Sequence, residues 1–83
     1  MRKTSLDAAT EISPLANRLR VMVFGIIRNR RGATDEEIQL ALRLNPSTSR
    51  PRRVELERAG IVKDSGKRRP TRSGRSAIVW VPA

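Results

Sequence analysis

The 83-residue sequence contains no cysteine and no histidine, and its only aromatic residues are Phe24 and Trp80. The missing side chains exclude disulfides, thiolate chemistry, zinc fingers and Ser-His-Asp triads, and they remove the commonest general base. A chain of this length forms one domain at most, with a thin aliphatic core and no deep cleft. We therefore expect no catalytic residues, no cofactor, no metal and no small-molecule substrate.

Long apolar runs are also missing. The longest covers residues 21–27, is interrupted by Gly25, and is too short for a membrane span or an ordinary signal sequence. We expect a soluble cytoplasmic protein without a membrane partner.

Positive charge is the most abundant feature. The chain has 18 Lys and Arg against 8 Asp and Glu, a net charge of +10, which favours polyanionic partners and nucleic acid first. Residues 50–75 hold ten basic and three acidic side chains, which is seven of the ten net charges. Such concentration is typical of a binding face rather than of scattered solubilising charge.

The N-terminal half of the sequence predicts two helices. Residues 1–13 lack sustained periodicity and are interpreted as a flexible tail or a short extra helix before a domain at residues 14–83. Pro14 is typical of a first helical turn, and apolar residues at three-and-four spacing predict an amphipathic helix to about Arg30, ended by Gly32.

A capping box follows at residues 34–37, Thr-Asp-Glu-Glu, and predicts a shorter helix whose buried stripe is Ile38, Ala41 and Leu42. Its clustered acids fit the positive end of a helix dipole better than a metal site. Residues 43–46 are expected to form a turn with Leu44 pointing inward.

A third helix is predicted at about residues 47–59, with Gly60 as its C-terminal stop. Because proline disrupts a helix interior, Pro51 places the regular part from about Ser49 onward. Ile61 and Val62 then open a strand, Ser65 and Gly66 start a turn, and residues 76–81 form the return strand of a hairpin with a basic tip at 66–75. In that strand Trp80 alternates with Ile78, so packing on the helices is favoured over base stacking.

Three helices followed by a hairpin predict an α+β, mainly α fold, a winged helix-turn-helix whose third helix enters the major groove. Residues 47–62, STSRPRRVELERAGIV, resemble the recognition-helix signature of MarR-like and small phage winged-helix regulators. The resemblance covers residues 14–81 and implies that Leu56, Ile61 and Val62 pack in the core while the start of the helix meets DNA. It also implies a bacterial or phage origin.

Candidate DNA-binding residues lie in two segments. Arg forks and helix N-termini bind guanine edges or phosphates, and basic hairpin tips bind the backbone or the minor groove. For Arg53 we also consider an inward packing of its stem, and for the tip a solvated basic loop. The candidates are Thr48, Ser49, Arg50, Arg52 and Arg53 in the helix, and Lys67, Arg68, Arg69, Arg72 and Arg75 in the wing.

A second surface is predicted on the first helix, where Val21, Phe24 and Arg28 share a stripe opposite the main apolar face. This stripe is either covered by Leu6, Ile12 or Trp80, or it forms a dimer or partner surface.

The leading hypothesis is a sequence-specific binder of double-stranded DNA that regulates transcription and is associated with the nucleoid. One alternative is a winged-helix adaptor that chiefly binds a host or phage protein in replication, recombination or host takeover. The other is a basic protein that binds nucleic acids without sequence specificity.

Overall fold

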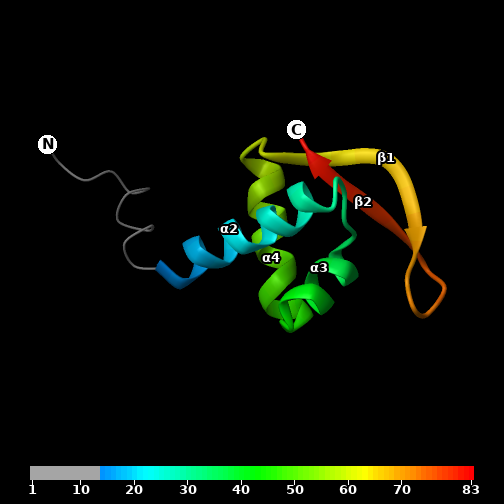
Figure 1. Cartoon of the computed structure of the whole chain (residues 1–83), viewed down its shortest axis with the longest axis horizontal. Coiled ribbons are helices and arrows are strands. Elements are labelled where there is room, and N and C mark those ends of the chain that lie inside the picture. Colours follow the sequence, from blue (N-terminus) through cyan, green and yellow to red (C-terminus); the bar gives the residue numbers. More distant parts are fainter. Residues whose placement is uncertain (1–13) are drawn as a thin grey trace, which may run out of the picture.

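The computed structural model describes residues 14–83 and consists of three helices followed by an antiparallel hairpin (Figure 1). The elements are α2 (Pro14–Asn29), α3 (Asp35–Leu42), α4 (Pro46–Arg58), β1 (Val62–Pro70) and β2 (Ser76–Pro82). This is an α+β fold in which the helices predominate, and its element order matches the layout predicted for a winged helix-turn-helix. The tail or extra helix predicted at residues 1–13, which includes Leu6 and Ile12, lies outside the described residues.

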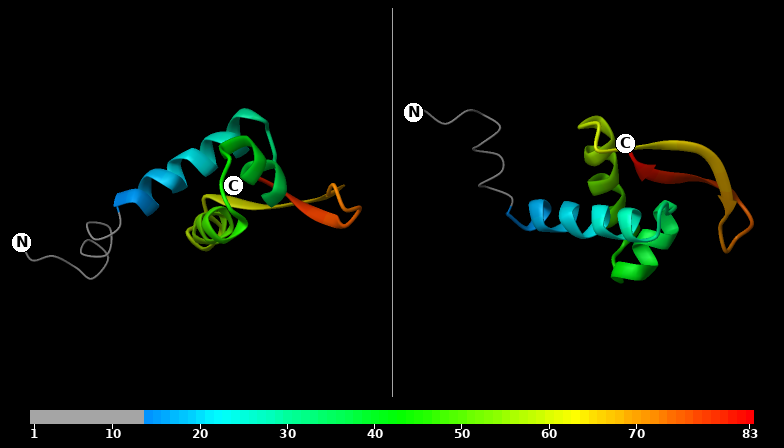
Figure 2. Two further views of the ribbon diagram at one scale, coloured as in Figure 1. Left: turned by 90° about the horizontal axis from the view of Figure 1, so that it is seen from below. Right: turned by 45° about the horizontal axis from the view of Figure 1, so that its top comes forward.

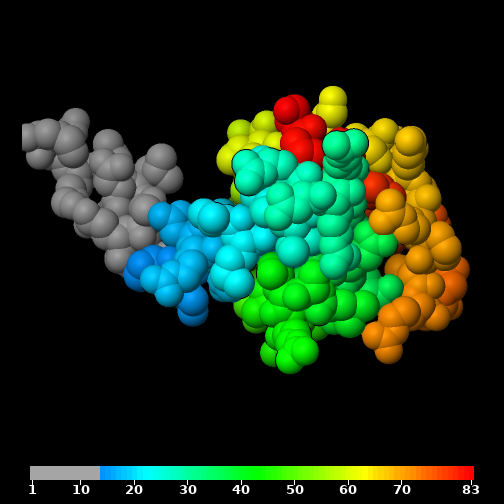
Figure 3. Space-filling model, in the orientation of Figure 1, coloured from blue at the N-terminus to red at the C-terminus, as the bar shows by residue number. Residues whose placement is uncertain are grey.

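Two sides of the molecule are built from different elements. Figure 2 (left) shows α4 and the beginning of β1 along one side and α2 along the opposite side. Figure 3 shows the face formed by α2 and α3, with the hairpin at one edge. No helix within residues 14–83 is both long and apolar enough to cross a membrane.

The core is a single aliphatic cluster closed by Trp80, to which every element contributes. Its members are Val23, Ile27, Ala33, Ile38, Leu56, Val62 and Trp80. The backbone of Trp80 pairs with Asp64 of β1 on one edge and with Ala33 on the other. The Ala33 amide donates to the Trp80 carbonyl at 2.9 Å, and the Trp80 amide donates back at 2.8 Å. The prediction that Trp80 packs on the helices, with Ile78 beside it, is confirmed.

Helix α2 ends at Asn29, close to the predicted position, through a left-handed residue that is an arginine. Arg31 has a φ of 55°, and the Gly32 amide donates to the Ile27 carbonyl at 2.9 Å, which is the bond pattern of a Schellman cap. Gly32, which was predicted to end the helix, is needed because of a close approach instead: a Cβ there would lie 3.0 Å from the Val79 side chain.

Helix α3 begins with the predicted capping box. The Thr34 hydroxyl accepts from the Glu37 amide at 3.1 Å, and the Glu37 carboxylate accepts from the Thr34 amide at 3.0 Å. Ile38 is buried and Leu42 packs against the core, but Ala41 is exposed, contrary to the prediction. A helix of two turns presents only one i, i+4 edge to the core, and Ala41 lies beside that edge on the solvent side. Leu44 is half-buried in the connection to α4.

Helix α4 begins at Pro46, three residues earlier than the regular part predicted from Ser49. Asn45 is the extended N-cap, and a proline in the first helical position needs no donor and has a suitable φ. Pro51 therefore lies inside the second turn, where it has no N–H for the Ser47 carbonyl. Gly60, with a φ of 76°, terminates the helix as predicted.

The predicted turn at Ser65 and Gly66 is wrong, because β1 continues to Pro70. Asp64 pairs with Trp80 and Arg68 pairs with Ile78, so three intervening residues of β1 oppose one residue of β2. The Asp64 carboxylate accepts from the Gly66 amide at 2.8 Å and holds this bulge. A bulge bends its strand, and β1 curves strongly in Figure 1. Lys67, Arg68 and Arg69 consequently lie on the strand, and only residues 71–75 connect β1 to β2.

Ile61 is a further departure from the sequence prediction. It lies before β1 and is 44% exposed, whereas Leu56 and Val62 are buried as the resemblance implied. The Ile61 amide donates to the Leu56 carbonyl at 2.9 Å, so the residue belongs to the helix cap and not to the strand.

The left-handed arginine at the end of α3 generates a stability prediction. Arg43 has a φ of 56°, a conformation that costs a residue with a Cβ about 1 kcal/mol more than glycine. We expect Arg43→Gly to raise the free energy of unfolding by about 0.5–1 kcal/mol in urea titrations. Arg18→Gly, at an exposed interior position of α2, should instead lower it by about 1 kcal/mol. If both variants lowered the free energy of unfolding by the same amount, the prediction would be wrong.

Candidate nucleic-acid interface

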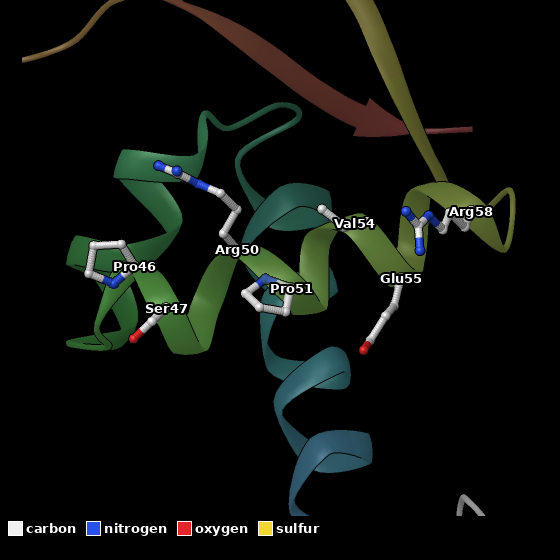
Figure 4. A pocket seen from close by; sticks show the side chains of 7 residues that line it. All are labelled: Pro46, Ser47, Arg50, Pro51, Val54, Glu55 and Arg58. Atoms are coloured by element: carbon white, nitrogen blue, oxygen red, sulfur yellow. The ribbon is translucent and has the colours of Figure 1, made fainter.

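The side of α4 that faces away from the core is the first part of the candidate interface. It carries Ser47, Arg50, Pro51, Val54 and Arg58, which recur at three-and-four spacing and are called the α4 ridge here. The ridge borders a shallow hollow of about 530 Å³. Figure 4 shows Ser47 toward one end and Arg58 toward the other, with Arg50, Pro51 and Val54 between them.

A second hollow, of about 380 Å³, lies between the first turn of α3, helix α4 and the hairpin. We call it the wing groove. Its rim includes Thr71, Ser73 and Arg75 from the connection between the strands. Arg50 lines both hollows, so the α4 ridge and the wing groove form one continuous surface from Arg58 to Arg75.

Only one of the five predicted helix residues lies on the α4 ridge. The Arg50 side chain is 61% exposed, whereas Ser49 is buried and Arg53 is 11% exposed. Thr48 and Arg52 turn toward the beginning of α2. The other four ridge residues were not predicted from the sequence as contacts: Ser47, Pro51, Val54 and Arg58. They could have been found from the expected burial of Leu56. At 100° per residue, Ser49 and Arg53 lie on the same side of the helix as Leu56, and the ridge residues lie on the opposite side.

Arg53 occupies the centre of an ionic cluster inside the fold. Its guanidinium lies 4.1 Å from the centroid of the Trp80 ring and binds Asp35 through two bonds, of 2.8 and 2.7 Å. Glu57 accepts a third bond at 2.9 Å. Burial lowers the pKa of Arg53, but the hydrogen bonds and charges of Asp35 and Glu57 outweigh burial and raise it above its ordinary value. Arg53 therefore packs inward, which is the second of the two orientations considered from the sequence.

Arg52 is engaged in a neighbouring cluster that joins α4 to α2. Its Nη2 donates to one Glu55 oxygen at 2.9 Å, and Arg20 of α2 donates to the other at 2.7 Å. The side chain of Arg52 is 20% exposed, and its buried Nε has no hydrogen-bond partner within the described part of the chain.

The wing residues fall into two groups. Arg69 binds both Glu37 oxygens at 2.6 Å, and Arg68 binds Asp64 at 3.1 Å. Lys67, Arg72 and Arg75 form no ion pair within residues 14–83.

The hairpin is attached to the acidic first turn of α3. The Arg72 amide donates to Glu36 at 3.0 Å, beside the Arg69–Glu37 pair. Burial raises the pKa of Glu37, but the bonds from Arg69 and the Thr34 amide, with the charges of Arg69 and Arg30, outweigh burial and lower it below its ordinary value. The acids predicted as a helix cap thus also position the wing.

The predicted partner surface on α2 is only partly open. Phe24 is half-buried and packs against the core cluster, and the Arg28 guanidinium lies 5.9 Å from its ring centroid. Val21 is 71% exposed. Phe24 is therefore covered largely by other side chains of the same domain.

Comparison of the chain with models of known protein families and with curated proteins finds no match.

We expect Arg53→Met to lower the free energy of unfolding by about 2–4 kcal/mol. The variant loses the stacking on Trp80 and leaves the carboxylate of Asp35, whose side chain is 22% exposed, without its main partner. Urea unfolding followed by Trp80 fluorescence measures the loss. Arg50→Met is the matched control, since its contact with Asp35 is long, at 3.6 Å, and exposed, and should cost less than about 0.5 kcal/mol. Equal costs would contradict a structural role specific to Arg53.

The Arg69–Glu37 pair generates a pH prediction. Folding lowers the pKa of Glu37, so its ionised carboxylate stabilises the folded state at pH values above its ordinary pKa of 4.5. This stabilisation is lost as the pH falls through the pKa of Glu37 in the folded state. Glu37→Gln keeps an acceptor for the capping box but removes the charge. We expect the free energy of unfolding of the wild type to exceed that of this variant by about 0.5–1 kcal/mol at pH 7. The difference should shrink below pH 4.5. If the difference in unfolding free energy did not depend on pH, the charge of Glu37 would not be its source.

Proposed function

We propose that this chain is a sequence-specific regulator that binds double-stranded DNA, of the bacterial or phage winged-helix type. The α4 ridge enters the major groove, and the hairpin follows the flanking backbone or minor groove. The proposal is carried by one observation: Arg50 lines both hollows, so helix and hairpin present a single surface with Arg58 and Arg75 toward its ends. An α-helix fits the major groove in width and depth.

The distribution of engaged charges supports a polyanionic partner. Each of the six acidic side chains in residues 14–83 already accepts a hydrogen bond from the protein. In contrast, five basic side chains of α4 and the hairpin have no ion pair within the same residues: Arg58, Lys63, Lys67, Arg72 and Arg75. These charges are available to phosphates, whose binding releases counterions.

A protein partner is the second candidate, because Leu15 and Val21 of α2 are 66% and 71% exposed. Six residues apart, they lie about 120° from each other around the helix axis. Met22, which is 40% exposed, shares the side of Leu15, so the three exposed apolar residues of α2 are divided between two sides of the helix. DNA is therefore the better supported partner.

The wing is tested by salt dependence. We expect Arg72→Ala and Arg75→Ala each to weaken binding to all duplexes alike and to lower the slope of log affinity against log salt by about one unit. Arg18→Ala, on α2, is the control and should leave the slope unchanged. An unchanged slope in the hairpin variants would remove the wing from the interface.

Sequence specificity is tested by selecting preferred duplexes from a random pool and titrating them against unselected DNA. Arg50→Ala should cost about 1–3 kcal/mol on the preferred duplex and less on unselected DNA, because an Arg fork contributes base discrimination of this size. Equal affinity of the wild type for all duplexes would contradict specificity, and an absence of binding would contradict the proposed function.

A further inference from the structure

The centre of the α4 ridge is apolar, unlike its two ends. Pro51 and Val54 are half-buried and lie between Arg50 and Arg58 (Figure 4). Neither side chain has a hydrogen-bond donor or acceptor, and proline also lacks a backbone N–H. This centre therefore has no side-chain group with which to read a base by hydrogen bonds.

The acidic residue beside the ridge does not supply the missing polar group. Both Glu55 oxygens are occupied, one by Arg20 at 2.7 Å and the other by Arg52 at 2.9 Å. A carboxylate that binds two arginines of its own protein is a poor acceptor for the amino group of cytosine, the base that free acidic side chains recognise.

Among the base edges in the major groove, the only apolar group is the C5 methyl of thymine. We propose that Val54 and Pro51 recognise a thymine methyl group at the centre of the bound site. Arg50 and Arg58 then contact guanines or phosphates on either side. The inference rests on the proposed function, since it requires α4 to lie in the major groove, and it adds the chemical identity of the base that the ridge selects.

The experiment replaces single thymidines of a selected duplex by deoxyuridine, which removes only the methyl group. We expect about a fourfold loss of affinity at one or two thymine positions, the equivalent of one buried methyl group. Deoxycytidine methylated at C5 carries the same methyl group in a C·G base pair. At the same positions, duplexes with methylated cytosine should therefore bind more tightly than duplexes with unmethylated cytosine.

Val54→Ala should reduce the preference for thymine over uracil duplexes, because one of the two side chains that contact the methyl group is shortened. Val21→Ala, the same change at an exposed position of α2, is the matched control and should keep the full preference for thymine. Pro51→Ala is a second variant whose helix is not endangered, and it should also reduce the preference. Circular dichroism verifies the fold of each variant.

The outcomes separate the inference from the proposed function. A reduced thymine preference in Val54→Ala but not in Val21→Ala supports the inference. Tight binding by the wild type without any difference between thymine and uracil, or an undiminished preference in Val54→Ala, overturns the inference and leaves DNA binding intact. Failure of the wild type to bind any duplex overturns both.

Discussion

The stacking of Arg53 on Trp80 is the interaction on which the arrangement of the domain depends. Arg53 comes from α4, its carboxylate partner Asp35 begins α3, and Trp80 belongs to β2 and pairs through its backbone with Ala33. One guanidinium therefore connects three elements whose shared aliphatic core is thin. It also fixes the rotation of α4 about its own axis. With Arg53 and Leu56 facing inward, the α4 ridge can only face outward.

The acids at the beginning of α3 have two roles, and the second limits how much of the net charge reaches a ligand. Asp35 binds Arg53, Glu36 accepts the Arg72 amide, and Glu37 caps the helix while it binds Arg69. Part of the positive charge of the hairpin is thus neutralised within the protein. Ten basic side chains have no ion pair within residues 14–83, of which five belong to α4 and the hairpin and five lie on or just after α2 and α3, so the total of +10 overstates the charge that the ridge and the hairpin present to a ligand.

Local patterns were sufficient to predict the order of the elements, the capping box, the Gly60 stop and the packing of Trp80, because each depends on neighbouring residues. They failed where a distant partner decides. A charged residue such as Arg53 is expected at the surface unless the sequence reveals that Asp35, 18 positions away, neutralises it. The bulge after Asp64 is similar, since Gly66 favours a turn and a bulge alike and the pairing with β2 selects between them.

Pro51 shows the opposite relation between local rule and structure. A proline in a helix interior is unfavourable by about 3 kcal/mol relative to alanine, and here the Ser47 carbonyl lacks its usual partner. Pro51 is half-buried and lines the shallow hollow beside Val54. Positions where a sequence opposes its own fold without a structural gain are typical of functional surfaces. The proposed contact of the α4 ridge with DNA would account for a proline at this position, and this reason is independent of charge.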